Sequence, residues 1–432
     1  MTDQAQSSAH DSNWFEASKF GLFIHWGLYA LRSRGEWAIY RDRISKDRYR
    51  QYADRFKPDR FDAAEWVAQA KAAGMKYIVF TSKHHDGFCM YDSAYTAWKV
   101  TNTPFGRDVL KEVAEATRAA GLRFGIYYSI WDLWHPGLDG GAEGNLDGDG
   151  NLKQRLGDLG WKPSREGIDY MKNQIRELLS NYGEVSLFWF DVRRAPAEAY
   201  EADDIMRMIR ELQPGILVNN RLVNDDSATE KADLVTPENK IPPEGMRDAE
   251  GNLQRWESCM CYNKSWGYVR EDTQFKGADG VVSRLVEIAG KGGNFLLNVG
   301  PNPRGELPAP KYPDMFRQVG TWLDRNGEGI YGTEPFGFDT WAFFSSKMYF
   351  TRRDDTLYVH VVDAPHDGRI FIPKIKGFRY TWMRLLDDGT ELRWIDENFL
   401  TLEKTEVTIT LPRRLDPLGV TSFAVEMTPE TT

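Results

Sequence analysis

Imidazole and carboxylate groups follow several apolar runs in this 432-residue chain. The clearest run covers residues 77–81, which are typical of a buried strand, and His84, His85 and Asp86 come soon after it. In parallel α/β architectures the carboxyl ends of the strands form the edge where ligands bind. Adjacent strand residues face opposite sides, so one histidine of the pair could have a structural role. The pattern predicts a binding or catalytic edge.

Other predicted strands also end in polar or aromatic side chains. These residues are His25, Tyr128, Trp189, Asp191, Arg221, Glu238 and Asn298. Two carboxylates at one mouth suit glycoside hydrolysis, in which one acts as nucleophile or base and the other protonates the leaving oxygen. Arg221 follows the next strand along the chain and could keep Asp191 ionised. Glu238 and Glu257 are both candidates for the acid, and this pattern leaves the choice open.

Metal-assisted hydrolysis uses the same residue types and is the rival chemistry. The first strand ends in a lone His25, where a zinc barrel would be expected to carry two histidines in a His-x-His pair. His84 and His85 are adjacent, so we expect their side chains to diverge. The sequence therefore predicts no metal and no other cofactor.

A predicted alternation of strands and helices would position these side chains. Strands are expected at 20–24, 77–81, 123–128, 185–190, 216–218, 233–236, 255–258 and 294–297, and helices at 63–73, 109–120, 168–179, 203–212, 281–289 and 315–323. Asp62 and Gly74 supply a start and a stop signal for the first of these helices. Eight strands alternating with helices over roughly 320 residues predict a (β/α)8-like (TIM) barrel.

The pattern changes from about residue 340 onward. Residues 347–351, 356–361 and 407–411 alternate between apolar and polar side chains, and Asp388-Gly389 is a turn signal. This predicts a C-terminal antiparallel β-sandwich. We therefore expect a (β/α)8-like catalytic domain over residues 1–338 and a β-sandwich domain over residues 339–432.

Composition excludes several classes of partner. The net charge is −9 and there is no long block of Lys and Arg, which argues against nucleic acid. The three cysteines, Cys89, Cys259 and Cys261, lack the spacing of a disulfide framework. The polar start lacks the apolar core of a secretory signal, and no stretch reaches the length of a membrane span. We expect a cytoplasmic protein with no membrane partner, and the oligomeric state is left open.

Short motifs in a fixed order cover the predicted barrel. They are KFGLFIHWG (19–27), GEW (35–37), KHHDGF (83–88), TPFGRD (103–108), GIYYS (125–129), WFD (189–191), NNR (219–221), TPE (236–238), WESCM (256–260), SWGY (265–268), NFLLNVGP (294–301) and NGEGIYG (326–332). Together they resemble the retaining α-L-fucosidases of glycoside hydrolase family 29. The resemblance implies an exo-acting enzyme that releases terminal α-linked L-fucose from glycans or glycosides by double displacement.

The resemblance also implies roles for single residues. Asp191 would be the nucleophile and Glu238 the acid/base, with Glu257 as runner-up. The residues expected to hold or line the sugar pocket are His25, Glu36, Trp37, His84, His85, Tyr128, Trp189 and Arg221. Glu36 and Trp37 come from the resemblance alone. Tyr127 and Tyr128 face opposite sides of a strand, and we choose Tyr128 for the pocket.

One position departs from the family pattern. The family usually has Gly after the nucleophile, whereas Asp191 is followed here by Val192, Arg193 and Arg194. Gly permits backbone angles that Val avoids, and the two arginines could place positive charge beside the leaving group. Two alternatives stay open: a hydrolase of a related α-L-sugar such as an α-L-galactoside, and a non-catalytic sugar-binding barrel. Intact Asp191 and Glu238 argue against the second.

Overall fold

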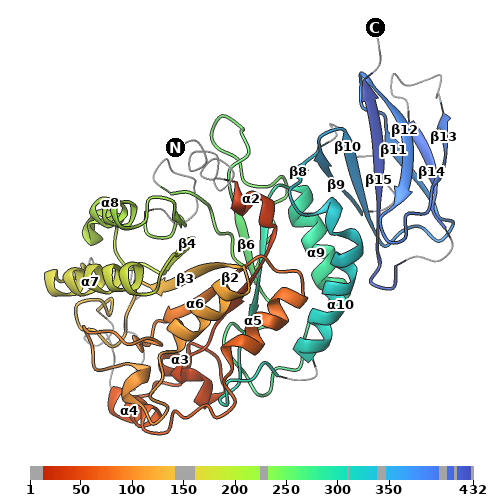
Figure 1. Cartoon of the computed structure of the whole chain (residues 1–432). Coiled ribbons are helices and arrows are strands. Elements are labelled where there is room, and N and C mark those ends of the chain that lie inside the picture. Colours follow the sequence, from red (N-terminus) through yellow and green to blue (C-terminus); the bar gives the residue numbers. More distant parts are fainter. Residues whose placement is uncertain are drawn as a thin grey trace.

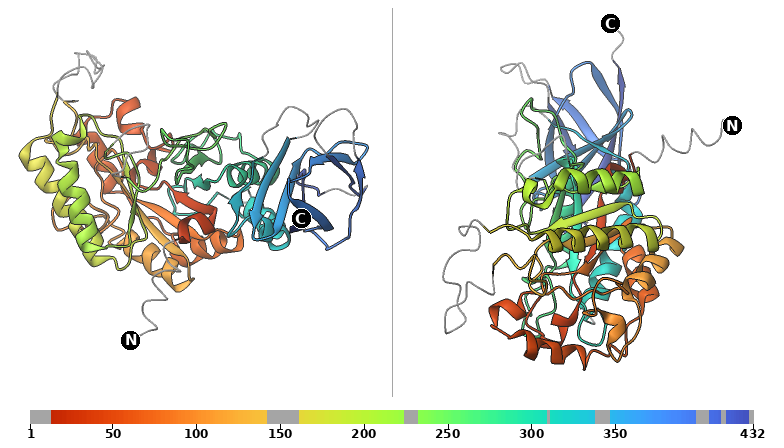
Figure 2. Two further views of the ribbon diagram at one scale, coloured as in Figure 1. Left: turned by 90° about the horizontal axis from the view of Figure 1, so that it is seen from above. Right: turned by 90° about the vertical axis from the view of Figure 1, so that its left-hand side faces the viewer.

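The computed structural model of the chain describes residues 13–141, 161–223, 232–308, 311–337, 347–397, 406–412 and 416–429. A parallel, curled sheet with helices around it forms the N-terminal part, and antiparallel sheets form the C-terminal part (Figure 1). The antiparallel part lies to one side of the barrel (Figure 2). The two predicted architectures are therefore confirmed.

Seven parallel strands form the barrel sheet in the order β5-β4-β3-β2-β1-β7-β6. Their bounds are β1 (Phe20–Ile24), β2 (Tyr77–Lys83), β3 (Arg123–Ser129), β4 (Leu187–Asp191), β5 (Leu217–Val218), β6 (Glu257–Cys261) and β7 (Asn294–Val299). Single parallel bridges, Asn219 to Leu234 and Val235 to Trp256, join the segment around residue 235 to both edges of the sheet. This segment closes the ring where the sequence predicts the strand at 233–236, through isolated bridges in place of a continuous ladder.

Helices surround the sheet as the sequence predicts. The long ones are α5 (Ala63–Ala72), α6 (Val109–Ala119), α7 (Arg165–Asn181), α8 (Ala202–Leu212), α9 (Ala278–Gly290) and α10 (Lys311–Asn326). The short ones are α2 (Trp14–Ser18), η1 (Leu28–Arg32), α3 (Ala38–Arg41), α4 (Lys46–Ala53), η2 (Val100–Asn102), η5 (Ala197–Tyr200) and η6 (Gly327–Gly329). The predicted cap is present, because Asp62 accepts a hydrogen bond from the Glu65 amide at 3.1 Å. In the described ranges, no helix has the length and apolar character needed to cross a bilayer.

Strand alternation separates two apolar cores. Side chains inside the barrel include Phe23, Val79, Tyr127, Leu187 and Trp189. Their neighbours along the same strands, including Ile24, Phe80, Ile126, Tyr128 and Phe190, belong to the core between sheet and helices. Because this alternation has a period of two, it decides which strand-end side chains reach the mouth of the barrel.

The C-terminal part is an antiparallel sandwich. One sheet has the order β12-β15-β10-β9-β8 and the other the order β11-β14-β13. Their bounds are β8 (Glu334–Pro335), β9 (Lys347–Arg353), β10 (Thr356–Val362), β11 (Arg369–Pro373), β12 (Phe378–Leu385), β13 (Arg393–Glu397), β14 (Glu406–Thr410) and β15 (Val420–Pro429). Trp322 of α10 donates a hydrogen bond of 3.2 Å to the Val420 carbonyl, which ties the sandwich to the barrel. The boundary after residue 338 stays a prediction, since residues 338–346 lie outside the described ranges.

Candidate active site

Asp191 is the last residue of β4 and lies at the mouth of the barrel. Tyr127 donates a hydrogen bond of 2.7 Å to Oδ2, and Nη1 of Arg221 lies 2.7 Å from Oδ1. Nε2 of His85 is 3.7 Å from Oδ2. Each carboxylate oxygen therefore has a donor, which holds the group in one orientation.

Arg221 connects Asp191 to a second carboxylate. Its Nη1 and Nη2 atoms each lie 3.2 Å from Oε2 of Glu238. Burial acts to lower the pKa of Arg221, but the neighbouring carboxylates, chiefly that of Asp191, raise it by more. The guanidinium therefore stays charged. Nη1 contacts both acids, at 2.7 Å and 3.2 Å, so these two oxygens can be no more than about 6 Å apart, which is compatible with the close carboxyl pair of retaining glycosidases.

The two carboxylates differ in exposure. The side chain of Asp191 is 11% exposed, whereas that of Glu238 is 45% exposed. Glu238 follows the segment that closes the barrel and is held there by a parallel bridge to Cys259. One carboxylate is thus shielded, and the other can be reached by water and by a departing group.

Glu257 lies elsewhere in the barrel. It is the first residue of β6, and it pairs with Asn294, the first residue of β7. Tyr77 donates to one of its oxygens, and Nε1 of Trp189 donates to the other at 3.1 Å. Burial raises the pKa of Glu257 to about 7. The strand predicted at 255–258 begins at Glu257 in the structure, two residues later than expected. Glu257 therefore lies at the amino-terminal end of β6, away from the mouth.

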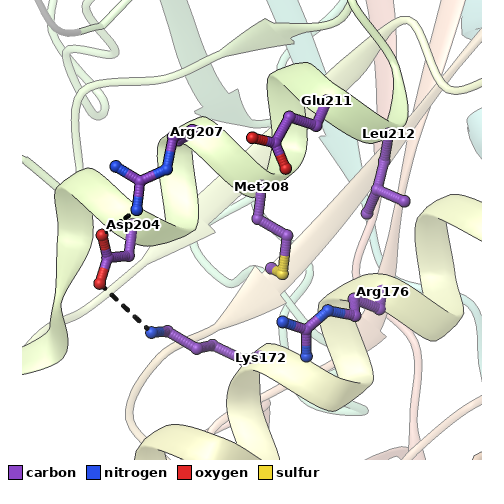
Figure 3. A pocket seen from close by; sticks show the side chains of 7 residues that line it. All are labelled: Lys172, Arg176, Asp204, Arg207, Met208, Glu211 and Leu212. Carbon is purple, nitrogen blue, oxygen red and sulfur yellow. Dashed lines mark hydrogen bonds and ion pairs between the residues drawn. The ribbon is translucent and has the colours of Figure 1, made fainter.

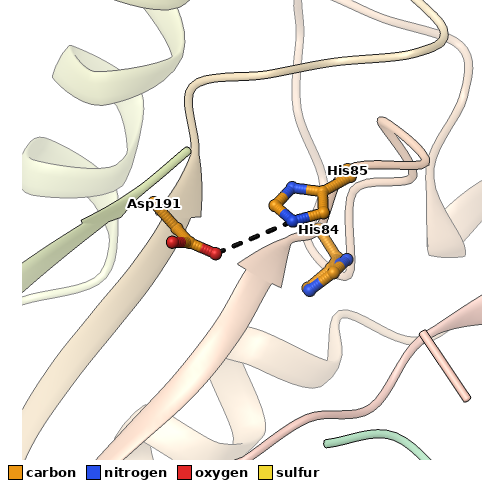
Figure 4. Close-up of side chains that lie close together, drawn as sticks. All are labelled: His84, His85 and Asp191. Carbon is orange, nitrogen blue, oxygen red and sulfur yellow. Dashed lines mark ion pairs between the residues drawn. The ribbon is translucent and has the colours of Figure 1, made fainter. Parts of the chain in front are cut away.

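His25, His84 and His85 lie side by side near Asp191. Ring centroids are 5.5 Å apart for His25 and His84, and 4.1 Å apart for His84 and His85. The expectation that the adjacent pair diverges is wrong, because β2 ends at Lys83 and the strand alternation no longer applies beyond it. Figure 4 shows both rings next to the carboxylate of Asp191.

Burial keeps these imidazoles neutral. It lowers the pKa of His25 to about 4 and lowers the pKa values of His84 and His85 as well. Nδ1 of His25 lies 2.6 Å from Oδ1 of Asn298, and Nδ1 of His85 lies 2.6 Å from Oγ of Ser129. Nδ1 of His84 is buried and has no partner among the described residues. Neutral rings with spare polar atoms suit the hydroxyl groups of a sugar.

The same cluster also has the residue types of a cation site. One donor atom from each of His84, His85 and Asp191 lies within 4.8 Å of the other two. However, Arg221 already binds the carboxylate at 2.7 Å, and its positive charge opposes a second cation there. The donor set thus fits a metal poorly, and the expected absence of a cofactor stays a prediction.

Glu36 and Trp37 reach the site from the loop after β1. Buried Glu36 accepts a hydrogen bond of 2.8 Å from the Gly267 amide, and burial raises its pKa. The Trp37 ring lies 4.7 Å from that of His85 and 5.5 Å from that of Trp131. Trp131 was not predicted as part of this wall. It follows β3 by two residues, and that position at the mouth is the signal that could have identified it.

The choice of Tyr128 for the pocket is wrong. Its hydroxyl contacts Nζ of Lys83 at 3.0 Å and Oε1 of Gln174 in α7 at 2.8 Å, so it lies between the sheet and a helix. Tyr127 faces the barrel interior instead. It pairs in register with Trp189, which shares a face with Asp191. The ring of His84 is stacked on Tyr127 with centroids 5.5 Å apart.

Trp189 lines the floor beneath the carboxylates. The Arg221 guanidinium lies over its ring, 4.4 Å from the centroid.

Directly after Asp191, Val192 has a φ of +42°, which is rare for a β-branched residue. Arg194 is stacked on Trp131, with its guanidinium carbon 4.0 Å from the ring centroid. The departure from the family pattern therefore places a strained valine and a cation at the edge of the site.

A family model described as alpha-L-fucosidase matches residues 1–328 of the chain. This chain belongs to the α-L-fucosidase family. It is therefore a glycoside hydrolase, and the resemblance inferred from its motifs is confirmed.

Individual relatives match over almost the whole chain. The human plasma alpha-L-fucosidase is 28% identical over 426 residues, covering 92% of this chain and 86% of that protein. The structure of alpha-L-fucosidase isoenzyme 1 from Paenibacillus thiaminolyticus has a TM-score of 0.86 at 37% identity and covers 97% of this chain and 99% of its own. A family 29 enzyme from Bacteroides thetaiotaomicron, trapped as a covalent intermediate with 2-fluoro-fucosyl fluoride, has a TM-score of 0.81 at 25% identity. That match covers 99% of this chain and 97% of the other.

Proposed function

We propose that this protein is an exo-acting, retaining α-L-fucosidase in which Asp191 is the nucleophile and Glu238 the acid/base. The observation that carries these two roles is the shared contact with Arg221, whose guanidinium binds both a shielded and an exposed carboxylate. The spacing suits a covalent mechanism, because an inverting enzyme needs room for a water molecule between substrate and base.

The first step forms a glycosyl-enzyme. An oxygen of Asp191 attacks the anomeric carbon of fucose while the bond from that carbon to the leaving oxygen breaks. Glu238 gives its proton to the leaving oxygen. Tyr127 and Arg221 hold Asp191 in place, so little of its orientation has to be established during the reaction.

The second step releases fucose. A water molecule enters from the side that the leaving group has vacated, and Glu238 takes a proton from it. The water oxygen attacks the anomeric carbon, and the bond to Asp191 breaks. Two inversions give net retention of configuration. The exposure of the Glu238 side chain supports this role, since the group must meet both the leaving group and water.

The sugar hydroxyls would be held by the polar groups around Asp191. The proposed binding residues are His25, Glu36, Trp37, His84, His85, Trp189 and Arg221, with Tyr127 in place of Tyr128. The buried Nδ1 atom of His84 supports this, because an unpaired buried polar atom costs free energy that a substrate hydroxyl would recover. The environment of Glu257 favours Glu238 as the acid/base, since both oxygens of Glu257 already accept hydrogen bonds.

Turnover of an aryl α-L-fucoside by wild type, Asp191→Gly, Glu238→Ala and Glu257→Ala, each with and without azide, tests this proposal. We expect Asp191→Gly to lose at least roughly 10³-fold in kcat. Azide should restore turnover in Glu238→Ala and give an α-fucosyl azide, because it attacks the same intermediate as water. Rescue of Glu257→Ala instead would move the acid/base to Glu257, and an inactive wild type would overturn the proposed function.

A further inference from the structure

A pocket of about 570 Å³ lies between the barrel and β9 of the larger sandwich sheet. Four cationic side chains line it, from the loop after Glu238, the loop before α9, α9 itself and the start of β9. They are Lys240, Lys276, Arg284 and Lys347. We call this pocket the basic cleft. It stands out in a chain whose net charge is −9.

Cationic side chains outnumber acidic ones in the lining of the basic cleft. Within the described ranges, none of the four cations forms an ion pair with a carboxylate. Glu287 also lines the cleft, but its Oε1 lies 2.6 Å from Nζ of Lys291. Burial and neighbouring Arg284 lower the pKa of Lys276. Like charges held together in a concave surface repel one another and attract an anion.

A second charged pocket shows the usual arrangement for comparison. Between α7 and α8, Lys172 and Arg207 both pair with Asp204, and Glu211 lies close by (Figure 3). There two of the three cations pair with an acid on the same or the facing helix. Among the residues that the structure describes, the cations of the basic cleft have no such ion pair, so ion pairing at the surface does not explain why they lie together.

The basic cleft begins one residue after the proposed acid/base. Asn239 follows Glu238, its amide donates to the Cys259 carbonyl at 2.9 Å, and its Oδ1 accepts from the Cys261 amide at 3.2 Å. Nζ of Lys276 donates to the carbonyl of the same Cys261. Because Glu238 must touch the leaving oxygen, we infer that the segment directly after it lies toward the leaving-group side of the fucose pocket.

We propose that the basic cleft binds an anionic group, a sulfate ester or a carboxylate, on the glycan to which the fucose is attached. This inference rests on the proposed function and adds a substrate class to it. Fucose itself is neutral, so the cationic side chains act on the remainder of the substrate. They would raise kcat/KM for acidic glycans without contacting the reacting atoms.

Paired substrates test the proposal. One is a disaccharide of fucose α-linked to a neutral sugar, and the others carry a sulfate ester or a carboxylate on that second sugar. At low ionic strength we expect wild type to prefer an acidic substrate by roughly tenfold in kcat/KM, and added salt to reduce the preference. The double variant Lys240→Gln/Lys347→Gln should lose the preference while keeping its kcat/KM for the neutral disaccharide. Comparing the two acidic substrates identifies the preferred anion.

The matched control is Arg176→Gln/Arg207→Gln in the pocket of Figure 3, which should keep the preference. Equal kcat/KM for all three substrates in wild type would overturn the inference and leave the fucosidase function intact. So would a preference that survives in the Lys240→Gln/Lys347→Gln variant. If no α-fucoside is hydrolysed, the proposed function fails instead. In that case, calorimetric binding of the sulfated second sugar to wild type and to the double variant tests anion binding at the basic cleft by itself.

Discussion

Tyr127 donates a hydrogen bond of 2.7 Å to Asp191, although the two residues lie on different strands and 64 positions apart. The register of β3 and β4 makes this possible. Ser129 pairs with Asp191, and Tyr127 lies two residues before Ser129, so its side chain is on the same face of the sheet. The contact places a neutral donor on the proposed nucleophile, opposite the charged donor Arg221.

Removing that donor should affect catalysis more than stability. We expect Tyr127→Phe to lower kcat/KM by about 10- to 100-fold, because a hydrogen bond to a charged group is lost. Tyr128→Phe is the matched control. It should keep kcat/KM within about threefold but lower the free energy of unfolding by about 1–3 kcal/mol, since buried Oε1 of Gln174 loses its hydrogen-bond donor. Steady-state kinetics and denaturant unfolding of both variants measure this, and equal kinetic effects would contradict the assignment.

Buried Glu257 should make stability depend on pH. Its pKa in the folded protein is about 7, above the ordinary value of 4.5, so the folded state binds its proton more tightly than the unfolded state. The stability it contributes is complete below about pH 4.5 and is lost as the pH rises through 7, by up to about 3 kcal/mol.

The variant Glu257→Gln isolates this effect, because Asp86, whose pKa burial raises to about 7, is present in both proteins. We expect the difference in unfolding free energy, wild type minus variant, to become less positive between pH 4.5 and 7. Denaturant unfolding at several pH values measures this difference. A difference that does not change with pH would show that Glu257 is ionised in the folded protein.

The backbone at Val192 should be strained. A left-handed conformation costs a residue with a Cβ atom about 1–2 kcal/mol, and Gly avoids most of that cost. We expect Val192→Gly to unfold with a free energy within about 1 kcal/mol of wild type. Val192→Ala keeps the strain and loses apolar contact, so it should be less stable than Val192→Gly. The reverse order in thermal or chemical unfolding would contradict the strain.

Metal removal should leave activity unchanged. The positive charge next to Asp191 comes from Arg221, and this charge opposes a cation at the cluster of His84, His85 and Asp191. Dialysis against EDTA, followed by kinetics on an aryl α-L-fucoside, checks this. A loss of activity that a divalent metal restores would instead assign the cluster as a metal site.

Much of the fold could be predicted because its signals are local. The strand at 20–24 matches β1, and the cap at Asp62 begins α5 as expected. The predicted strand at 233–236 was less accurate, because bridges to the two sheet edges, and not its own sequence, determine its conformation. The start of β6 was predicted two residues too early. Glu257 was therefore expected near the mouth, whereas it is the first residue of the strand.

The site was predictable where it depends on strand ends. Asp191, Arg221 and His25 were found in this way, and the structure brings them together at one mouth. Tyr127 was missed although alternation carries the signal: Phe124, Ile126 and Tyr128 form the apolar face that helices cover. Glu36 and Trp37 lie in a loop, where periodicity gives no information, so only the resemblance indicated them. The cytoplasmic location stays a prediction.

The closure of the barrel by single bridges has a mechanical consequence. Asp191 ends a strand with ladder partners on both sides, whereas the segment before Glu238 has most of its backbone hydrogen bonds on one side, to residues 255–259. Local opening costs less where few backbone hydrogen bonds must break, so amide deuterium exchange should be faster around residue 235 than in β4. We therefore expect the backbone that carries the acid/base to yield more easily than the backbone that carries the nucleophile, which would let one site accept leaving groups of different size.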